Sequence, residues 1–236
     1  MDWSGNATIL SARKHGENAV ILTAFARDAG IVSGVLPGGA SAKRAAMIQP
    51  GNVVAMRWRA RVEGQIGTIT AEPALARPGL IATGLALAGV NAVTALLGFA
   101  LPERDPHPML HDATELMLDR MDQDGDWSHA YLAWELRLLD ELGFGLDLRS
   151  CAVTGARDGL AFVSPRTGRA VSRAGAGEWA DRLLPLPSLL GGTGNGGLPE
   201  AFALSGHFLH HHLSESHAGK SLPPARDRLI ARLLAG

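Results

Sequence analysis

The segment that most limits what this chain can fold into is 52–62, which reads NVVAMRWRARV. Apolar side chains recur at every second position from Val54 to Val62, and arginines alternate with them from position 57 onward. These arginines are Arg57, Arg59 and Arg61. Because neighbouring side chains of a β-strand point to opposite faces, the alternation predicts a strand with an apolar inner face and a basic outer face. Trp58 belongs to the inner face on this prediction.

Four other short runs of apolar and β-branched residues are predicted as strands in the same part of the chain. They cover residues 7–13, 19–25, 31–36 and 67–71, with turn-forming residues between them. An Ala-rich segment at 41–48 is predicted as a helix between the third and fourth strands. Five strands with one helix at this position are typical of an OB-fold β-barrel, which binds oligonucleotides on one strand face. We therefore expect an OB-fold DNA-binding domain over residues 1–78.

The formal charge changes sign along the chain. Residues 1–80 contain nine basic and five acidic side chains, a balance of +4, whereas the other 156 residues contain 13 and 18, a balance of −5. A basic N-terminal part is typical of a module that binds an anion, and a chance fluctuation is the alternative. Three like charges on alternate residues of one strand repel one another, so an ordinary solvent-exposed face more usually mixes signs.

We expect the outer face of this strand to follow a phosphate backbone. The predicted DNA-binding residues are its three arginines and two basic pairs elsewhere in the domain, namely Arg13, Lys14, Lys43, Arg44, Arg57, Arg59 and Arg61. The alternative for each of them is an ordinary solvated charge. Aromatic residues for base stacking are few in this part, so binding is expected to be mainly electrostatic and insensitive to base sequence.

The second part of the chain, residues 79–236, is predicted as an α-helical domain. Its first segment, 80–101, holds 22 residues without a charge, which reaches the length of a membrane span. Polar residues and glycines dilute its apolar character, so a buried helix is the favoured interpretation and a membrane span the alternative. Two short strand-like runs predict a β-ribbon inserted at about 151–175. The other helices are predicted at 107–121, 131–142, 178–184 and 224–234.

Motifs for catalysis, metal binding or nucleotide binding are weak throughout. Cys151 is the single cysteine, which excludes an internal disulfide and a CxxC…CxxC zinc site. His207 and His211 are four residues apart and could ligate zinc, but no third ligand is evident, and an ordinary apolar helix face is the favoured interpretation. The glycine-rich segment 191–197 contains GxGxxG outside the strand–helix context of a nucleotide site. We therefore expect no enzyme, with no catalytic residue, cofactor or metal.

Six short motifs are spaced along the whole chain. They are ARKHGE at 12–17, the run from Gly30 to Gly39, IQPG at 48–51, LPERDPHP at 101–108, the stretch from Glu135 that ends in LGFG at 142–145, and GHFL at 206–209. In this order they resemble the RecO family of bacterial recombination-mediator proteins. The resemblance implies an α+β protein, with an N-terminal OB-fold and then a helical domain that a small ribbon interrupts.

The resemblance also implies a function in DNA repair and homologous recombination through the RecF pathway. It implies binding of single- and double-stranded DNA and annealing of complementary strands. Its implied protein partners are the single-stranded-DNA-binding protein, RecR and, indirectly, RecA. We accordingly expect a cytoplasmic, nucleoid-associated protein without a membrane partner. The alternatives are a non-catalytic protein-interaction module, with an OB-fold and a helical docking domain, and a membrane-associated protein that uses segment 80–101.

One departure from the family concerns the ribbon. Many family members hold it with a four-cysteine zinc site. In this chain Cys151 matches the first ligand, whereas Thr154, Ser172 and Gly175 stand where the other three are expected. One thiolate cannot complete a tetrahedral structural site. We therefore expect a zinc-less ribbon that packing and hydrogen bonds hold together.

Overall fold

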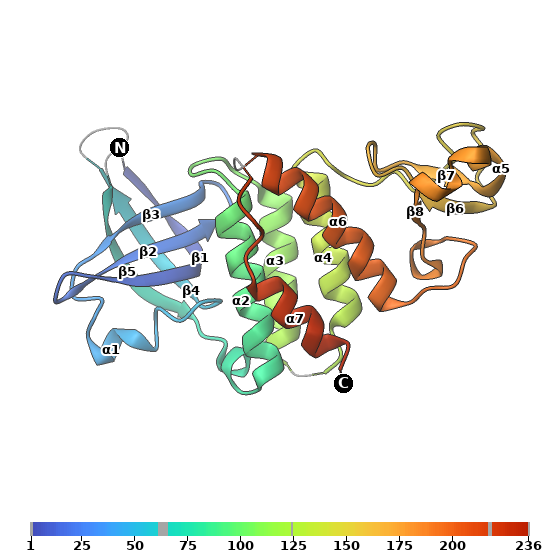
Figure 1. The fold of residues 1–236 in the computed structure, drawn as a ribbon. Coiled ribbons are helices and arrows are strands. Elements are labelled where there is room, and N and C mark those ends of the chain that lie inside the picture. The colour runs from blue at the N-terminus through green and yellow to red at the C-terminus, as the bar shows by residue number, and fades with distance from the viewer. Residues whose placement is uncertain (1, 61–65, 124, 217–218, 236) are drawn as a thin grey trace. The chain divides into compact units, whose positions relative to one another are not determined.

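The computed structural model describes residues 2–60, 66–123, 125–216 and 219–235. A closed barrel of five strands forms the N-terminal part (Figure 1). Its elements are β1 (Asp2–His15), β2 (Ala19–Ala26), β3 (Gly30–Leu36), the short helix α1 (Ala42–Ala45), β4 (Val53–Arg59) and β5 (Gly67–Leu75). The order around the barrel is β1-β2-β3-β5-β4, in which β3 and β5 are parallel and the other neighbours antiparallel. The predicted OB-like barrel is confirmed.

The interior of the barrel follows the alternation in the sequence. Buried and exposed residues alternate along β4 from Val54 to Arg59, and Trp58 is 4% exposed. The indole N–H of Trp58 donates to the carbonyl of Ser33 at 2.9 Å. A Cβ atom at Gly67 would lie 2.2 Å from Nε1 of Trp58, so β5 passes this ring only because residue 67 has no side chain. β4 ends at Arg59, and the last arginine of the predicted row, Arg61, lies outside the described residues.

Two helices belong to the same compact unit as the barrel, which comprises residues 1–125 and 223–229. They are α2 (Gly84–Ala100) and α3 (Pro108–Asp122), and a 3₁₀-helix, η1 (Pro78–Ile81), precedes them. The hydroxyl of Thr83 accepts a hydrogen bond from the N–H of Ala86 at 3.1 Å, which starts α2 inside the uncharged run. The described parts of the chain contain no helix that is both long and apolar enough to cross a membrane.

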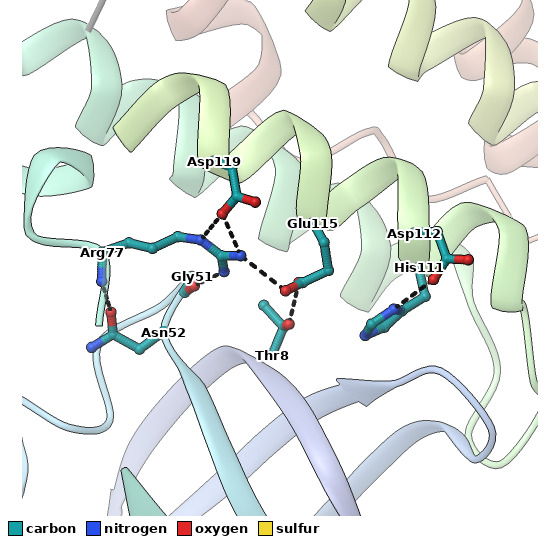
Figure 2. Close-up of polar contacts among 8 residues, drawn as sticks. All are labelled: Thr8, Gly51, Asn52, Arg77, His111, Asp112, Glu115 and Asp119. Atoms are coloured by element: carbon teal, nitrogen blue, oxygen red, sulfur yellow. Dashed lines mark hydrogen bonds and ion pairs between the residues drawn. The ribbon is translucent and has the colours of Figure 1, made fainter. Parts of the chain in front are cut away.

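A buried arginine joins α3 to the barrel (Figure 2). The side chain of Arg77 is 2% exposed, and its guanidinium donates to Asp119 at 2.8 Å, to Glu115 at 2.9 Å and to the carbonyl of Gly51 at 2.6 Å. The hydroxyl of Thr8 on β1 donates to the same Glu115 carboxylate. Burial alone would lower the pKa of Arg77, but the hydrogen bonds and charges of Glu115 and Asp119 outweigh it, and this pKa is raised.

The second compact unit comprises residues 126–222 and 230–236. Its two long helices are α4 (Ser128–Glu141) and α6 (Leu198–Ser216), and α7 (Ala225–Leu233) runs from the first unit into the second. The ring of Tyr131 on α4 lies 6.0 Å from that of Phe202 on α6. The hydroxyl of Ser205 on α6 donates to the buried carboxylate of Glu135 on α4 at 2.7 Å. Aromatic packing and one satisfied polar pair therefore hold these two helices together.

The predicted ribbon is a sheet of three short strands in the order β7-β6-β8. These strands are β6 (Leu160–Val163), β7 (Ala170–Ser172) and β8 (Leu184–Pro185), and the one-turn helices beside them are α5 (Arg173–Ala176) and η3 (Ser188–Leu190). The third strand was not predicted, because two residues carry no periodicity. The helix predicted at 178–184 is wrong in type and extent: residues 177–182 form a 3₁₀-helix, η2 (Gly177–Arg182), and Leu184 pairs with Val163 of β6 instead.

The two compact units do not divide at the predicted domain boundary after residue 78. That boundary follows the change from strands to helices along the chain, whereas α2 and α3 belong to the unit of the barrel, in which α2 contacts β1 and both helices contact η1. An OB-fold domain over 1–78 and a helical domain over 79–236 therefore stay a prediction about sequence modules.

Candidate nucleic-acid interface

The outer face of β4 carries the described part of the predicted arginine row. Arg57 is exposed, and in the sheet register it lies between Ser4 of β1 and Thr70 of β5. It forms no ion pair with any residue that the structure describes. A phosphate oxygen placed here would meet one unpaired guanidinium and two hydroxyl groups, which are common donors to the nucleic-acid backbone.

Arg59, the next arginine of the row, has a partner. Its Nε donates to Oδ2 of Asp2 on the adjacent β1 at 3.1 Å, and the two side chains are 65% and 53% exposed. Glu72 is also on this face, opposite Ala55 in the register. The face therefore carries both positive and negative charges, whereas the sequence of this strand alone predicted a basic face. Exposed ion pairs of this kind contribute little to stability, so a phosphate could replace Asp2 at Arg59.

An open depression of about 750 Å³ lies on this face of the barrel, and we call it the β4 groove. Its polar lining comes from β1, β4, β5 and the α1 segment, namely Ser4, Asn6, Arg44, Arg57, Thr70 and Glu72. Nη1 of Arg44 donates to the carbonyl of Pro37 at 3.0 Å, which holds this side chain against the barrel. The fold thus brings together two predicted residues, Arg44 and Arg57, that are 13 positions apart in the sequence. Lys43 is in α1, but its side chain is outside what the structure describes.

Arg13 and Lys14 lie elsewhere, on the second half of β1 beside its turn into β2. Both are exposed, and neither lines the β4 groove. Arg13 instead lines a second open depression, of about 650 Å³, together with Arg228 of α7. We call it the α2 depression, because Asn91, Ala95 and Gly98 of α2 form one of its walls.

Two other basic residues of the N-terminal part have structural partners. Arg77 is buried in the ion-pair cluster described above. Arg27 makes two hydrogen bonds to Asp112 of α3, at 2.9 and 3.0 Å. The hydrogen bond and charge of Asp112 raise the pKa of Arg27, and those of Arg27 lower the pKa of Asp112. The positive balance of residues 1–80 therefore overstates the charge that is available to a ligand.

The residues that sequence reasoning missed are those that reach these sites from other strands or helices. Ser4 and Thr70 flank Arg57 by strand register, and Arg228 comes from the last helix. No local pattern marks any of the three. Thr70 is a polar position within the predicted strand 67–71, whereas Ser4 precedes the predicted strand 7–13, because β1 begins at Asp2.

The ribbon brings together the four positions at which the family's zinc ligands were expected. Sγ of Cys151, 2% exposed, accepts hydrogen bonds from the N–H and hydroxyl of Ser172 at 3.2 and 3.4 Å and from the N–H of Thr154 at 3.4 Å. A Cβ atom at Gly175 would lie 2.8 Å from this sulfur. Burial raises the pKa of Cys151, but the donors from Ser172 and Thr154 outweigh burial and lower it to about 6. Hydrogen bonds to one sulfur join the turns of the ribbon, and this donor set does not suit a tetrahedral zinc ion.

The histidines of α6 form a different group from the predicted pair. The side-chain ligand atoms of His211, His212 and Glu215 all lie within 4.8 Å of one another. The ring of His212 stacks on that of Phe144 at 3.9 Å, and burial followed by the charge of His211 lowers the pKa of His212. This triplet is where a transition-metal ion would find ligands among the described residues, and the expected absence of a metal stays a prediction.

The chain matches known proteins along nearly its whole length. Residues 1–75 match the family model "Recombination protein O N terminal", and residues 82–221 match "Recombination protein O C terminal". The chain is 68% identical over 235 residues to "DNA repair protein RecO" of Paracoccus denitrificans, covering 100% of this chain and 97% of that protein. It is 48% identical to the protein of the same name from Roseobacter denitrificans, covering 98% and 97% of the two chains. It is 49% identical to the protein of that name from Cereibacter sphaeroides (strain ATCC 17025), with 100% of both chains covered.

Proposed function

The chain belongs to the RecO family of DNA repair and recombination proteins, and from this premise we propose that it is a non-enzymatic mediator that binds DNA and anneals complementary strands. The observation that carries the proposal is the β4 groove, an open depression on an OB-like barrel with Arg44, Arg57 and two hydroxyl side chains in its lining. Guanidinium and hydroxyl groups are common donors to phosphate oxygens, and contacts of that kind carry no sequence information.

The proposed mechanism needs no bond making. Guanidinium groups that neutralise phosphates lower the repulsion between two strands, and base pairing alone then selects the complement. The predicted module of residues 1–78 supplies the DNA contacts. The predicted acidic module of residues 79–236 supplies docking surfaces for protein partners. The candidate partners are the single-stranded-DNA-binding protein and RecR, and RecA is an indirect partner. Activity with these partners at the nucleoid in the cytoplasm is part of the same proposal.

A salt titration of the full chain tests the DNA-binding step. Fluorescence anisotropy with a labelled single strand should give a logarithm of affinity that falls linearly with the logarithm of salt concentration. Arg57→Ala should reduce the slope by about 0.7, the value for one phosphate contact on a single strand, with similar losses for different base sequences. Arg166→Ala is the matched control, because it removes one exposed arginine from the turn of the ribbon.

Annealing of complementary oligonucleotides without any nucleotide tests the second step. The full chain should accelerate annealing at physiological salt, and Arg57→Ala combined with Arg44→Ala should slow it. A flat salt response would instead favour the protein-interaction module. A requirement for ATP would contradict the proposed mechanism.

A further inference from the structure

The α2 depression differs from the β4 groove in its charge. Two arginines line it, Arg13 from β1 and Arg228 from α7, and both are exposed. None of the described residues in its lining is acidic, whereas Glu72 lines the β4 groove. The electrostatic conditions for an anion are therefore more favourable in the α2 depression than on the face that the sequence singled out.

The walls of the α2 depression supply room and neutral donors. Asn91, Ala95 and Gly98 follow one another at spacings of four and three residues, which places them on one face of α2. Their small size leaves the depression open, and a Cβ atom at Gly98 would meet nothing within 4 Å. Ser11 and Thr23, paired across β1 and β2, add hydroxyl groups to the lining, and the hydroxyl of Thr23 also shares a hydrogen bond of 3.2 Å with that of Ser33. Two guanidinium groups beside hydroxyls and an amide are a donor set for a phosphate backbone.

The two sites are separated along one strand. The β4 groove touches β1 at Ser4–Asn6, and the α2 depression touches it at Leu10, Ser11 and Arg13. From residue 5 to residue 11 a strand advances about 20 Å at its usual rise. That length is more than twice the Debye length of about 8 Å at physiological ionic strength. Phosphates at one site therefore repel phosphates at the other only weakly, and the two sites can be filled together.

We propose that the α2 depression is a second phosphate-binding site for nucleic acid, through which one chain holds a second strand while the β4 groove holds the first. This inference rests on the proposed function, because a second strand matters only to a protein that anneals. It adds that Arg228, outside the predicted DNA-binding domain, contacts the nucleic acid together with Arg13.

Gly98 offers a matched pair of variants for the test. Gly98→Glu and Gly98→Gln place side chains of equal size in the open depression, and only the first adds a negative charge beside the two arginines. Both replace a helical glycine by a better helix former, so the fold should persist in each. The assay follows energy transfer between two non-complementary oligonucleotides, one carrying a donor dye and the other an acceptor, at increasing concentrations of the second strand.

The chain and Gly98→Gln should take up the second strand equally well. If two contacts to phosphate are lost, Gly98→Glu should bind it about tenfold more weakly at 0.15 M salt, from a slope of about 0.7 per contact. The affinity for the first strand should stay within about twofold in both variants, because Arg57 is unchanged. Arg228→Ala should lower the salt slope of second-strand binding, and Arg232→Ala, an exposed arginine on the same helix outside the lining, should not.

The outcomes separate this inference from the proposed function. Equal uptake of the second strand by Gly98→Glu and Gly98→Gln, with annealing intact, would overturn the second site and leave the mediator function standing. Failure of the unaltered chain to bind even the first strand would overturn both.

Discussion

Replacement of Arg77 by methionine should loosen the attachment of α3 to the barrel. Methionine keeps most of the volume of the side chain but removes the charge from a position that is 2% exposed. Glu115 and Asp119 then lose their shared cation, and the carbonyl of Gly51 loses its donor. Removing one partner of a buried ion pair costs about 3–5 kcal/mol, because the remaining charge stays desolvated.

The partners of Arg77 place the cost at the lower end of that range. Glu115 is 24% and Asp119 is 47% exposed, so both carboxylates recover part of their hydration in the variant. We expect the free energy needed to open this unit to fall by about 3 kcal/mol. About 1.4 kcal/mol corresponds to a factor of ten in the opening equilibrium constant. Hydrogen exchange of α3 and of the first half of β1 should therefore be faster by roughly 150-fold in the regime where exchange reports stability.

Amide exchange followed by mass spectrometry suits this test because it reads the unit of the barrel separately from α4 and α6. Arg27→Met is the control, because it removes an exposed arginine whose two hydrogen bonds also reach α3. Exposed pairs of this kind contribute little, so exchange in α3 should hardly change. Equal effects of Arg77→Met and Arg27→Met would show that burial of Arg77 does not determine its contribution.

Three other predictions concern a glycine, a thiol and a metal. Gly67→Ala should destabilise the barrel by about 1–3 kcal/mol, because its Cβ atom would clash with Trp58 at 2.2 Å. Gly98→Ala should instead stabilise the chain by about 0.5–1 kcal/mol, because its Cβ atom meets nothing within 4 Å and alanine is the better helix former. Urea denaturation of both variants measures these opposite changes in the free energy of unfolding. Since the folded pKa of Cys151, about 6, lies below its unfolded value near 8.5, the thiolate contributes stability that is full above that unfolded value and lost as the pH falls through 6. The protection factors of amides in the ribbon, which are corrected for the intrinsic exchange rate at each pH, should accordingly rise between pH 6 and pH 9, and Cys151→Ala should abolish that trend. Protein purified without a histidine tag should contain far less than one zinc per chain and keep its melting temperature in a chelator; stoichiometric zinc would contradict this and point to His211, His212 and Glu215.

Local pattern in the sequence was sufficient for the strands of the barrel and for the direction of their side chains. A period of two places Val54, Met56 and Trp58 in the core and Arg57 and Arg59 outside, whatever the neighbours are, because the pleat of a strand sets that alternation. The order of the strands and the helix between the third and the fourth then indicated the OB-like barrel. Family motifs extended this to the helical part, and the four positions 151, 154, 172 and 175 indeed meet at one sulfur.

Tertiary structure alone decided which charges are available and which groups share a site. Asp2 neutralises part of Arg59 because β1 pairs with β4, and Arg77 is withdrawn from solvent by two carboxylates of α3, about 40 residues further along the chain. Arg13 and Arg228 line one depression although more than 200 residues separate them. The physical reason is that periodicity reports the face on which a side chain lies, whereas electrostatic free energy depends on the distance to charges that other segments bring beside it.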